Sequence, residues 1–135
     1  MARNYIADSS ALVALVSCDD QHHGWIAAHI DTSPWPWLTC EAALTEAFHL
    51  AGIRGAPQFK QMLRRGAVVL SFHLGYELGP VLTLMDKYAD VPMSLADACL
   101  VRMSETLPDP VVLTTDADFK IYRRHSRQVV PCLLP

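Results

Sequence analysis

The sequence has little net charge, no closely spaced cysteines and no long apolar run. Its formal net charge of −3 gives no overall attraction to nucleic acid, which argues against a protein that coats a phosphate backbone by charge alone. The four cysteines, Cys18, Cys40, Cys99 and Cys132, form no C-x-x-C pair and no zinc-like cluster with histidine. No segment approaches the roughly 20 apolar residues that span a bilayer. We therefore expect a cytoplasmic protein with reduced cysteines and no membrane partner.

The sequence does contain enough apolar material for a compact core. The apolar fraction is 51% and the charged fraction is 19%, and both values are typical of globular proteins. A chain of 135 residues fits one domain and is too short for two ordinary ones. We therefore expect residues 1–135 to form one domain without an internal linker or repeat.

Short apolar runs alternate with longer segments of helical composition. The runs predict strands over residues 4–7, 37–40, 67–72, 111–115 and 128–134, the third of them buried and the last at a sheet edge. The longer segments predict helices over residues 10–16, 19–30, 41–51, 57–63, 76–89 and 94–107. Ser10 is the expected N-cap of the first helix, and Gly52 is expected to stop the third. This alternation predicts an α/β fold with a central, mainly parallel sheet flanked by helices.

Two aspartates directly follow predicted strands. Asp8 comes after residues 4–7, and Asp116 comes after residues 111–115. Ligands of open α/β sheets bind beyond the carboxyl ends of the strands, so both side chains are expected at that edge. A turn or helix cap is the alternative role for Asp8, because Asp commonly bonds its own backbone.

Two glutamates lie in the helix that begins near residue 41. Glu46 has Ala42, Ala43 and Leu50 one turn away, which predicts a position on an apolar, core-facing stripe. A carboxylate there is costly unless it is paired or binds a cation. Glu41 points elsewhere, and its place in the first turn is explained by the helix dipole, yet it remains a competitor for the same role.

Asp97 raises the same question one turn into a later helix. Met93, Leu100 and Val101 surround it along the helix, which indicates an apolar setting. The pattern S-x-x-D from Ser94 to Asp97 also resembles a capping box, so a purely structural role stays open.

Asp8, Asp116, Glu46 and Asp97 would repel one another without a cation if their side chains meet at one place. A site whose ligands are all oxygen atoms suits Mg²⁺ or Mn²⁺. The blocks "IADSSAL", "EAALTEAFHL", "MSLADACLV" and "LTTDADF" occur in this order over nearly the full chain. In order and spacing they resemble the PIN domain, in particular the VapC-type toxin ribonucleases. Many relatives carry Asn or Thr shortly after the first Asp, where this chain has Ser9 and Ser10, a change that keeps a hydroxyl.

The resemblance implies metal-assisted hydrolysis of RNA phosphodiester bonds with Mg²⁺ or Mn²⁺ as cofactor. It assigns the metal-site and catalytic carboxylates to Asp8, Glu46, Asp97 and Asp116, with Ser10, Thr114 and Asp118 in support. Candidate contacts to the RNA backbone are Arg64, Arg65, Lys120 and Arg123, each of which is also explained as solvated surface. An antitoxin protein and a second copy of the chain are the implied partners. One-metal and two-metal sites, and toxin and RNA-processing roles, are all compatible with the pattern.

Two other functions fit parts of the sequence. A non-catalytic binding module would keep the carboxylates for structural reasons. A phosphoacceptor signalling domain also has strand-end aspartates, but it needs an acidic pair after the first strand and a lysine after a late one. Here Asp8 stands alone and the late strand leads to Asp116.

Overall fold

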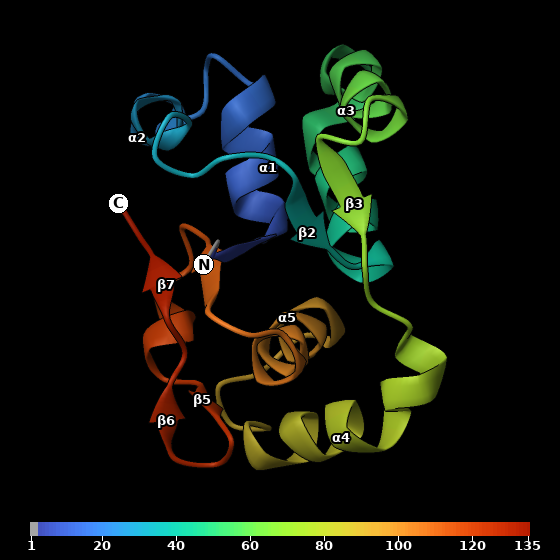
Figure 1. Ribbon diagram of the computed structural model, residues 1–135, viewed down its shortest axis with the longest axis vertical. Helices are drawn as coiled ribbons and strands as arrows, with labels where there is room; N and C mark the ends of the chain where they lie inside the picture. Colours follow the sequence, from blue (N-terminus) through green and yellow to red (C-terminus); the bar gives the residue numbers. More distant parts are fainter. Residues whose placement is uncertain (1–2) are drawn as a thin grey trace.

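The computed structural model describes residues 3–135 and contains a five-stranded sheet whose strands are all parallel (Figure 1). Their order is β3 (Val68–Leu70), β2 (Trp37–Thr39), β1 (Asn4–Ala7), β4 (Pro110–Leu113) and β7 (Cys132–Leu133). The chain therefore runs outward from β1 to one edge and then returns to the other side of β1. The expected α/β fold with a parallel central sheet is confirmed.

The helices cover both faces of this sheet (Figure 1). One face carries α1 (Ser9–Val16), α2 (His23–His29) and α3 (Glu41–Arg64), and the other carries α4 (Leu74–Lys87) and α5 (Leu95–Thr106). Side chains alternate across β1, as the two-residue period of a strand requires. Ile6 packs into the core under α4 and α5, whereas Tyr5 and Ala7 pack under α1, α2 and α3.

The first helix begins one residue earlier than expected. Asp8, rather than Ser10, is the N-cap, and its side chain accepts the amide hydrogen of Ser9. The strand β1 ends at Ala7 and the helix begins at Ser9, so the cap falls on the only residue between them. Ser10 is instead the second residue of α1, and its hydroxyl is available for other contacts.

Gly52 ends the first helical stretch of α3, as expected, but a second stretch begins directly after it. The helix runs from Glu41 to Arg64, and Gly52 adopts φ 64° and ψ −158° inside it, a conformation that glycine tolerates best. The expected gap between residues 51 and 57 is therefore wrong. Pro57 is the fifth residue after the break, inside the second helical stretch, and it gives no amide hydrogen to the carbonyl of Ile53.

The last predicted strand is split in two. Gln128–Val129 forms β6, which pairs antiparallel with β5 (Arg123–Arg124), while Cys132–Leu133 forms the edge strand β7. The carbonyl of Pro131 between them accepts the amide hydrogen of Val112 at 2.8 Å, which leads the chain into the main sheet. The sequence also did not predict the short 3-10 helix η1 (Ala117–Lys120).

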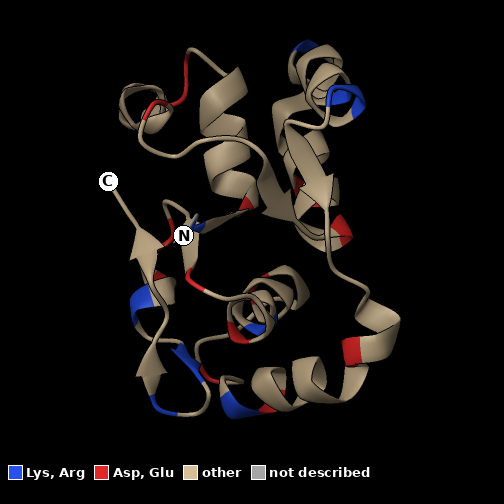
Figure 2. Ribbon diagram, in the orientation of Figure 1, with Lys and Arg blue, Asp and Glu red and all other residues tan. Residues whose placement is uncertain are grey.

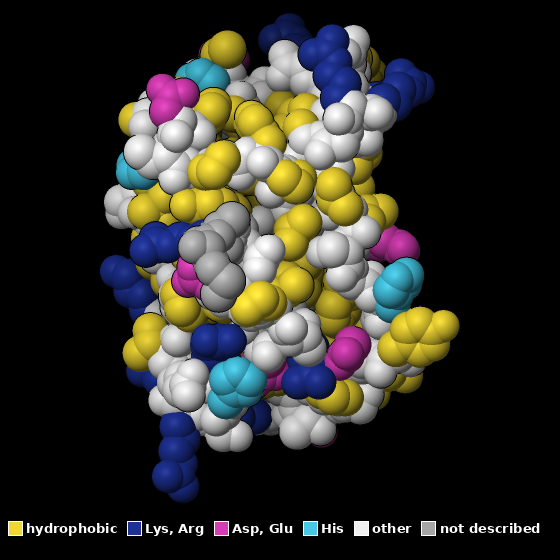
Figure 3. All heavy atoms as spheres, viewed as in Figure 1, with side chains coloured by type: hydrophobic (Ala, Val, Ile, Leu, Met, Phe, Trp, Pro, Cys, Tyr) yellow, Lys and Arg dark blue, Asp and Glu magenta, His cyan; other side chains and the backbone are white. Residues whose placement is uncertain are grey.

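The opposite edge of the sheet is more exposed than expected. Val68 is buried, but Val69 and Leu70 are accessible because β3 is an edge strand. Figure 3 shows hydrophobic side chains on this side of the molecule. None of the helices within residues 3–135 combines the length and apolar character needed to cross a membrane.

Candidate functional site

Asp8 is a buried carboxylate at the carboxyl end of the central strand. Its side chain is only 4% exposed. Oδ1 accepts the amide hydrogen of Ser9 at 2.7 Å, and Oδ2 accepts the hydroxyl hydrogen of Thr114 at 2.7 Å. The hydroxyl of Ser10 lies 3.2 Å from Oδ2. The cap and the flanking hydroxyl groups therefore hold this carboxylate in one orientation.

Hydroxyl groups also connect the ends of β1 and β4. Thr114 Oγ1 accepts the amide hydrogen of Asp116 at 3.0 Å, and Ser10 Oγ accepts that of Thr115 at 3.0 Å. Thr114 is fully buried, so its hydroxyl is both donor to Asp8 and acceptor from the loop after β4. These bonds set the position of the Asp116 backbone relative to Asp8.

Glu46 reaches the same region, but not from the core. It is exposed, and Leu50 on the expected apolar stripe is 59% exposed, so the prediction that Glu46 faces the core is wrong. The buried face of α3 is instead formed by Ala43, Leu44 and Ala47. Glu46 Oε1 accepts the hydroxyl hydrogen of Ser9 at 2.6 Å.

Ser9 is a site residue that the sequence interpretation did not include. Its hydroxyl oxygen is 2.6 Å from Glu46 but 3.4 Å from Asp8 Oδ1, so its single hydrogen goes to the glutamate. Its backbone amide donates to Asp8. Ser9 thus links the two carboxylates; the sequence signals for this role are its position directly after Asp8 and the hydroxyl that it keeps where many PIN relatives carry Asn or Thr.

Glu41 lies apart from this network. It is exposed in the first turn of α3 and lines a pocket with Cys40, His73 and Tyr76. That pocket contains neither Asp8 nor Glu46 in its wall. Of the two competing glutamates, the structure brings Glu46 to Asp8.

Asp97 combines a capping role with a second contact. Ser94 is the N-cap of α5, as expected, and its hydroxyl accepts the amide hydrogen of Asp97 at 3.0 Å. The carboxylate of Asp97 is half-buried and accepts the hydroxyl hydrogen of Tyr122 at 2.9 Å. Tyr122 is fully buried and was not foreseen, because it follows η1 and no local pattern relates it to α5.

Asp116 and Asp118 form the start of η1. Asp116 is the N-cap, and its Oδ1 accepts the amide hydrogen of Asp118 at 2.9 Å. Both side chains are half-buried. A cap role is therefore established for Asp116, alongside its place in the loop that Thr114 fixes.

The aspartates influence one another electrically. Burial raises the pKa of Asp8 from 3.8 to about 6, hydrogen bonding from Thr114 opposes the rise, and the charge of Asp97 adds to it. Burial also raises the pKa of Asp97, against the hydrogen bond from Tyr122 and together with the charge of Asp116. Three aspartates from β1, α5 and the loop after β4 thus share one region of negative potential.

The donor chemistry of this region fits a hard divalent cation. All of its side-chain donors are oxygens, which suits Mg²⁺ or Mn²⁺ better than zinc. Within residues 3–135, no three Asp, Glu, His or Cys side chains stand close enough together to hold one ion between them. Mg²⁺ typically contacts one or two carboxylates and keeps several waters, so the donor set fits an ion that is partly hydrated.

The four basic residues proposed to contact RNA fall in two places. Arg64 and Arg65 end α3 close to Ala67, whose carbonyl accepts the amide hydrogen of Trp37 at 2.8 Å. They therefore lie near the amino ends of β2 and β3, at the far end of α3 from its glutamates (Figure 2). Lys120 is exposed on η1, beyond the carboxyl end of β4.

The guanidinium of Arg123 is bonded to nearby backbone carbonyls. Its guanidinium donates to the carbonyls of Lys120 at 2.8 Å, Tyr122 at 3.0 Å and Ile121 at 3.3 Å. It thereby satisfies carbonyls at the end of η1. Of the four basic residues, Lys120 is the one both near the carboxylates and exposed.

Comparison with protein-family models gives no match, and comparison with curated proteins gives none.

Proposed function

We propose that this chain is a metal-dependent endoribonuclease of the PIN type. The observation that carries the proposal is the setting of Asp8, a carboxylate that is 4% exposed, fixed by hydroxyl and amide donors, and placed in the field of Asp97. Burying a carboxylate is costly unless it is paired or binds a cation. Packing of the core alone therefore does not explain an acid at this position. A bound cation would offset that cost.

The carboxylates would hold the ion and orient water. Asp8, Asp97 and Asp116 are the candidate ligands, one or two of them in direct contact with the ion and the rest through its bound water, and Glu46 joins them through the Ser9 hydroxyl. Mg²⁺ or Mn²⁺ in such a site lowers the pKa of bound water and offsets charge on the scissile phosphate. Ser10 and Thr114 keep Asp8 oriented, Asp118 and the cap bond keep Asp116 in place, and Tyr122 does the same for Asp97. Lys120 is the candidate to contact an RNA phosphate.

The biological role proposed with this activity is that of the toxin in a VapBC-type toxin–antitoxin pair. It rests on the resemblance of the four acidic blocks to VapC-type ribonucleases. The same resemblance supports an antitoxin protein as partner and a homodimer as the working form. An antitoxin gene beside the gene for this chain, and inhibition of RNA cleavage by its product, would test this part.

The test of the activity is RNA cleavage with a matched set of variants. The protein is incubated with single-stranded RNA in Mg²⁺, in Mn²⁺ and in EDTA. We expect cleavage only with metal, and a loss of at least about tenfold in Asp8→Asn, since the change removes charge from the proposed ligand set. Asp31→Asn is the control, because Asp31 is exposed in the loop that leads to the amino end of β2, whereas the carboxylates follow the carboxyl ends of β1 and β4. Equal activity in Asp8→Asn and Asp31→Asn would refute the proposal.

A non-catalytic binding module is the second candidate. It is favoured by the absence, among residues 3–135, of three metal-ligating side chains close enough to share one ion. Such a module would bind RNA in EDTA as well as in Mn²⁺ and would leave it intact. Measuring RNA binding and cleavage on the same samples separates the two functions.

A further inference from the structure

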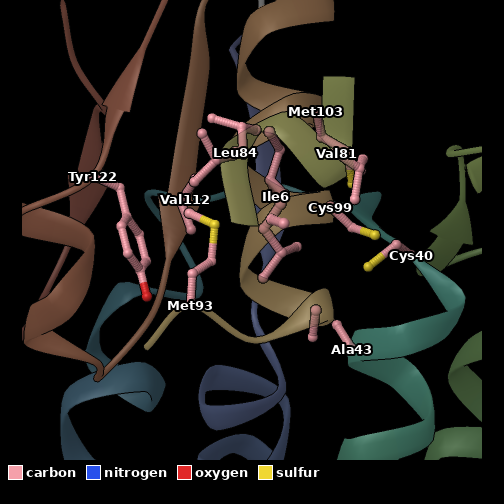
Figure 4. Packing of buried hydrophobic residues seen from close by; sticks show 14 of the residues in the cluster. Ile6, Cys40, Ala43, Val81, Leu84, Met93, Cys99, Met103, Val112 and Tyr122 are labelled. Carbon is pink, nitrogen blue, oxygen red and sulfur yellow. The ribbon is translucent and has the colours of Figure 1, made fainter. Parts of the chain in front are cut away.

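Two buried thiols face each other between α3 and α5. Cys40 and Cys99 are each 1% exposed. Cys40 follows β2 and is the N-cap residue of α3, whereas Cys99 lies inside α5. Figure 4 shows their sulfur atoms pointing toward one another in the core beside Val81 and Met103. The other cysteines are placed differently, with Cys18 exposed and Cys132 half-buried in β7.

The surroundings of the two thiols differ in a way that assigns them different tasks. The Cys99 thiol, as hydrogen-bond donor, lowers the pKa of Cys40; burial opposes this, and the backbone of Ala43 at the start of α3 adds to the lowering. A thiol at a helix N-terminus is favoured as thiolate by the helix dipole. Cys40 is therefore suited to attack an oxidant as a thiolate, and Cys99 is suited to attack the oxidised sulfur of Cys40.

A pocket borders both buried cysteines. It has a volume of about 340 Å³, and its wall includes Cys40 and Cys99 together with Phe72. Glu41, His73 and Tyr76 line the same pocket and are exposed, so they form its mouth. The pair is thus shielded from bulky reagents and lies beside a pocket large enough to hold a peroxide.

We propose that Cys40 and Cys99 form a redox-active dithiol that a peroxide converts into an intramolecular disulfide. The Cys40 thiolate attacks one oxygen of hydrogen peroxide, the O–O bond breaks, and the products are a sulfenic acid and, after protonation, water. The Cys99 sulfur then attacks the sulfenic sulfur, the S–O bond breaks, and the thiol hydrogen leaves with the hydroxyl as a second water. Overall the two thiols are oxidised to one disulfide and the peroxide is reduced to water. The inference does not depend on ribonuclease activity.

The experiment uses the full chain with Cys18→Ser and Cys132→Ser, so that only the facing pair can react. The folded protein is treated with hydrogen peroxide, quenched, and analysed by intact mass and by peptide mapping without reductant. We expect a loss of two hydrogen atoms and a peptide that joins Cys40 to Cys99, both reversed by dithiothreitol. The same cross-linked peptide is expected from the unsubstituted chain.

Two results would overturn the inference. In the first, both thiols stay reduced while Cys18 of the unsubstituted chain is oxidised. In the second, Cys40 gains oxygen atoms while Cys99 remains a free thiol, which would show that the two sulfurs do not reach one another.

A further variant tests the order of attack. With Cys99→Ser added, the sulfenic acid on Cys40 has no resolving thiol, so the sulfenic-acid reagent dimedone should label Cys40. With Cys40→Ser added instead, labelling of Cys99 should be at least about tenfold slower, because its thiol lacks the helix N-terminus that favours a thiolate. Faster labelling of Cys99 would reverse the assigned roles. Circular dichroism of each variant establishes that the labelled protein is folded.

Discussion

Thr114 donates its hydroxyl hydrogen to Oδ2 of Asp8 at 2.7 Å and so joins the ends of two neighbouring strands that are 106 residues apart in sequence. Removing this donor should destabilise the protein without creating a cavity. Thr114→Val keeps the shape but leaves a buried carboxylate short of one bond, for which we expect a loss of about 1–3 kcal/mol in the free energy of unfolding at neutral pH. Urea denaturation measures it.

Two controls accompany this change. Thr114→Ser retains a hydroxyl and should lose less stability than the valine variant. Thr83→Val removes an exposed hydroxyl that bonds the carbonyl of Gly79 within α4, and it should cost well under 1 kcal/mol. Equal losses for Thr114→Val and Thr83→Val would show that the bond to Asp8 contributes little.

The metal-free protein should lose stability as pH rises from about 4 to 7. Burial and then the charge of Asp97 raise the pKa of Asp8 from 3.8 to about 6, so in that interval the folded chain holds a proton that the unfolded chain has released. The contribution is therefore fully present below about pH 3.8 and is lost as pH passes through about 6. For Asp8 alone the loss is roughly 3 kcal/mol. Asp97, with its pKa raised in the same direction, adds to the trend.

Denaturation in EDTA at several pH values checks this prediction. Asp8→Asn cannot titrate, so its stability should vary less between pH 4 and 7 than that of the unsubstituted chain. Parallel curves for the two proteins would mean that Asp8 is ionised at little cost in the folded state.

Divalent metal should raise the melting temperature by relieving the same repulsion. A ligand that binds only the folded chain stabilises it by mass action, so millimolar Mg²⁺ or Mn²⁺ should increase the melting temperature and EDTA should reverse the gain. Differential scanning fluorimetry of the unsubstituted chain and of Asp97→Asn measures both effects. We expect Asp97→Asn to be at least as stable without metal, because one negative charge is removed, and to respond less to metal. An unchanged metal response would remove Asp97 from the proposed ligand set.

Glu46 and Glu41 should differ in their effect on RNA cleavage. Glu46 accepts the Ser9 hydroxyl hydrogen at 2.6 Å, whereas Glu41 lines the separate pocket beside Cys40. We expect Glu46→Gln to lower the cleavage rate at least about tenfold and Glu41→Gln to leave it nearly unchanged. Single-turnover cleavage with Mn²⁺ compares them. A larger effect of Glu41→Gln would mean that Glu41, at the start of α3, takes the place of Glu46 in the proposed site.

Features that depend on one strand and its end were the most predictable from sequence. The parallel sheet followed from alternating segments, and the position of Asp8 at its carboxyl edge followed from the residue after β1. The face of Glu46 was not predictable in this way, because the packing of α1 against α3 decides which side of that helix is buried. Ser9 and Tyr122 were missed for a related reason. Their partners, Glu46 and Asp97, lie on other elements and share no local pattern with them.

The central place of β1 also has a consequence for the order of folding. One neighbour of β1, the strand β2, lies only 30 residues or so along the chain, but the other, β4, comes after residue 109. Contacts between segments so distant in sequence form late, since the entropy of closing the intervening loop opposes them. During synthesis, the segment from β1 to α3 can associate while Asp8 still lacks its Thr114 donor and its neighbour Asp116. The acidic edge can therefore be completed only after Thr114 and Asp116 have been synthesised.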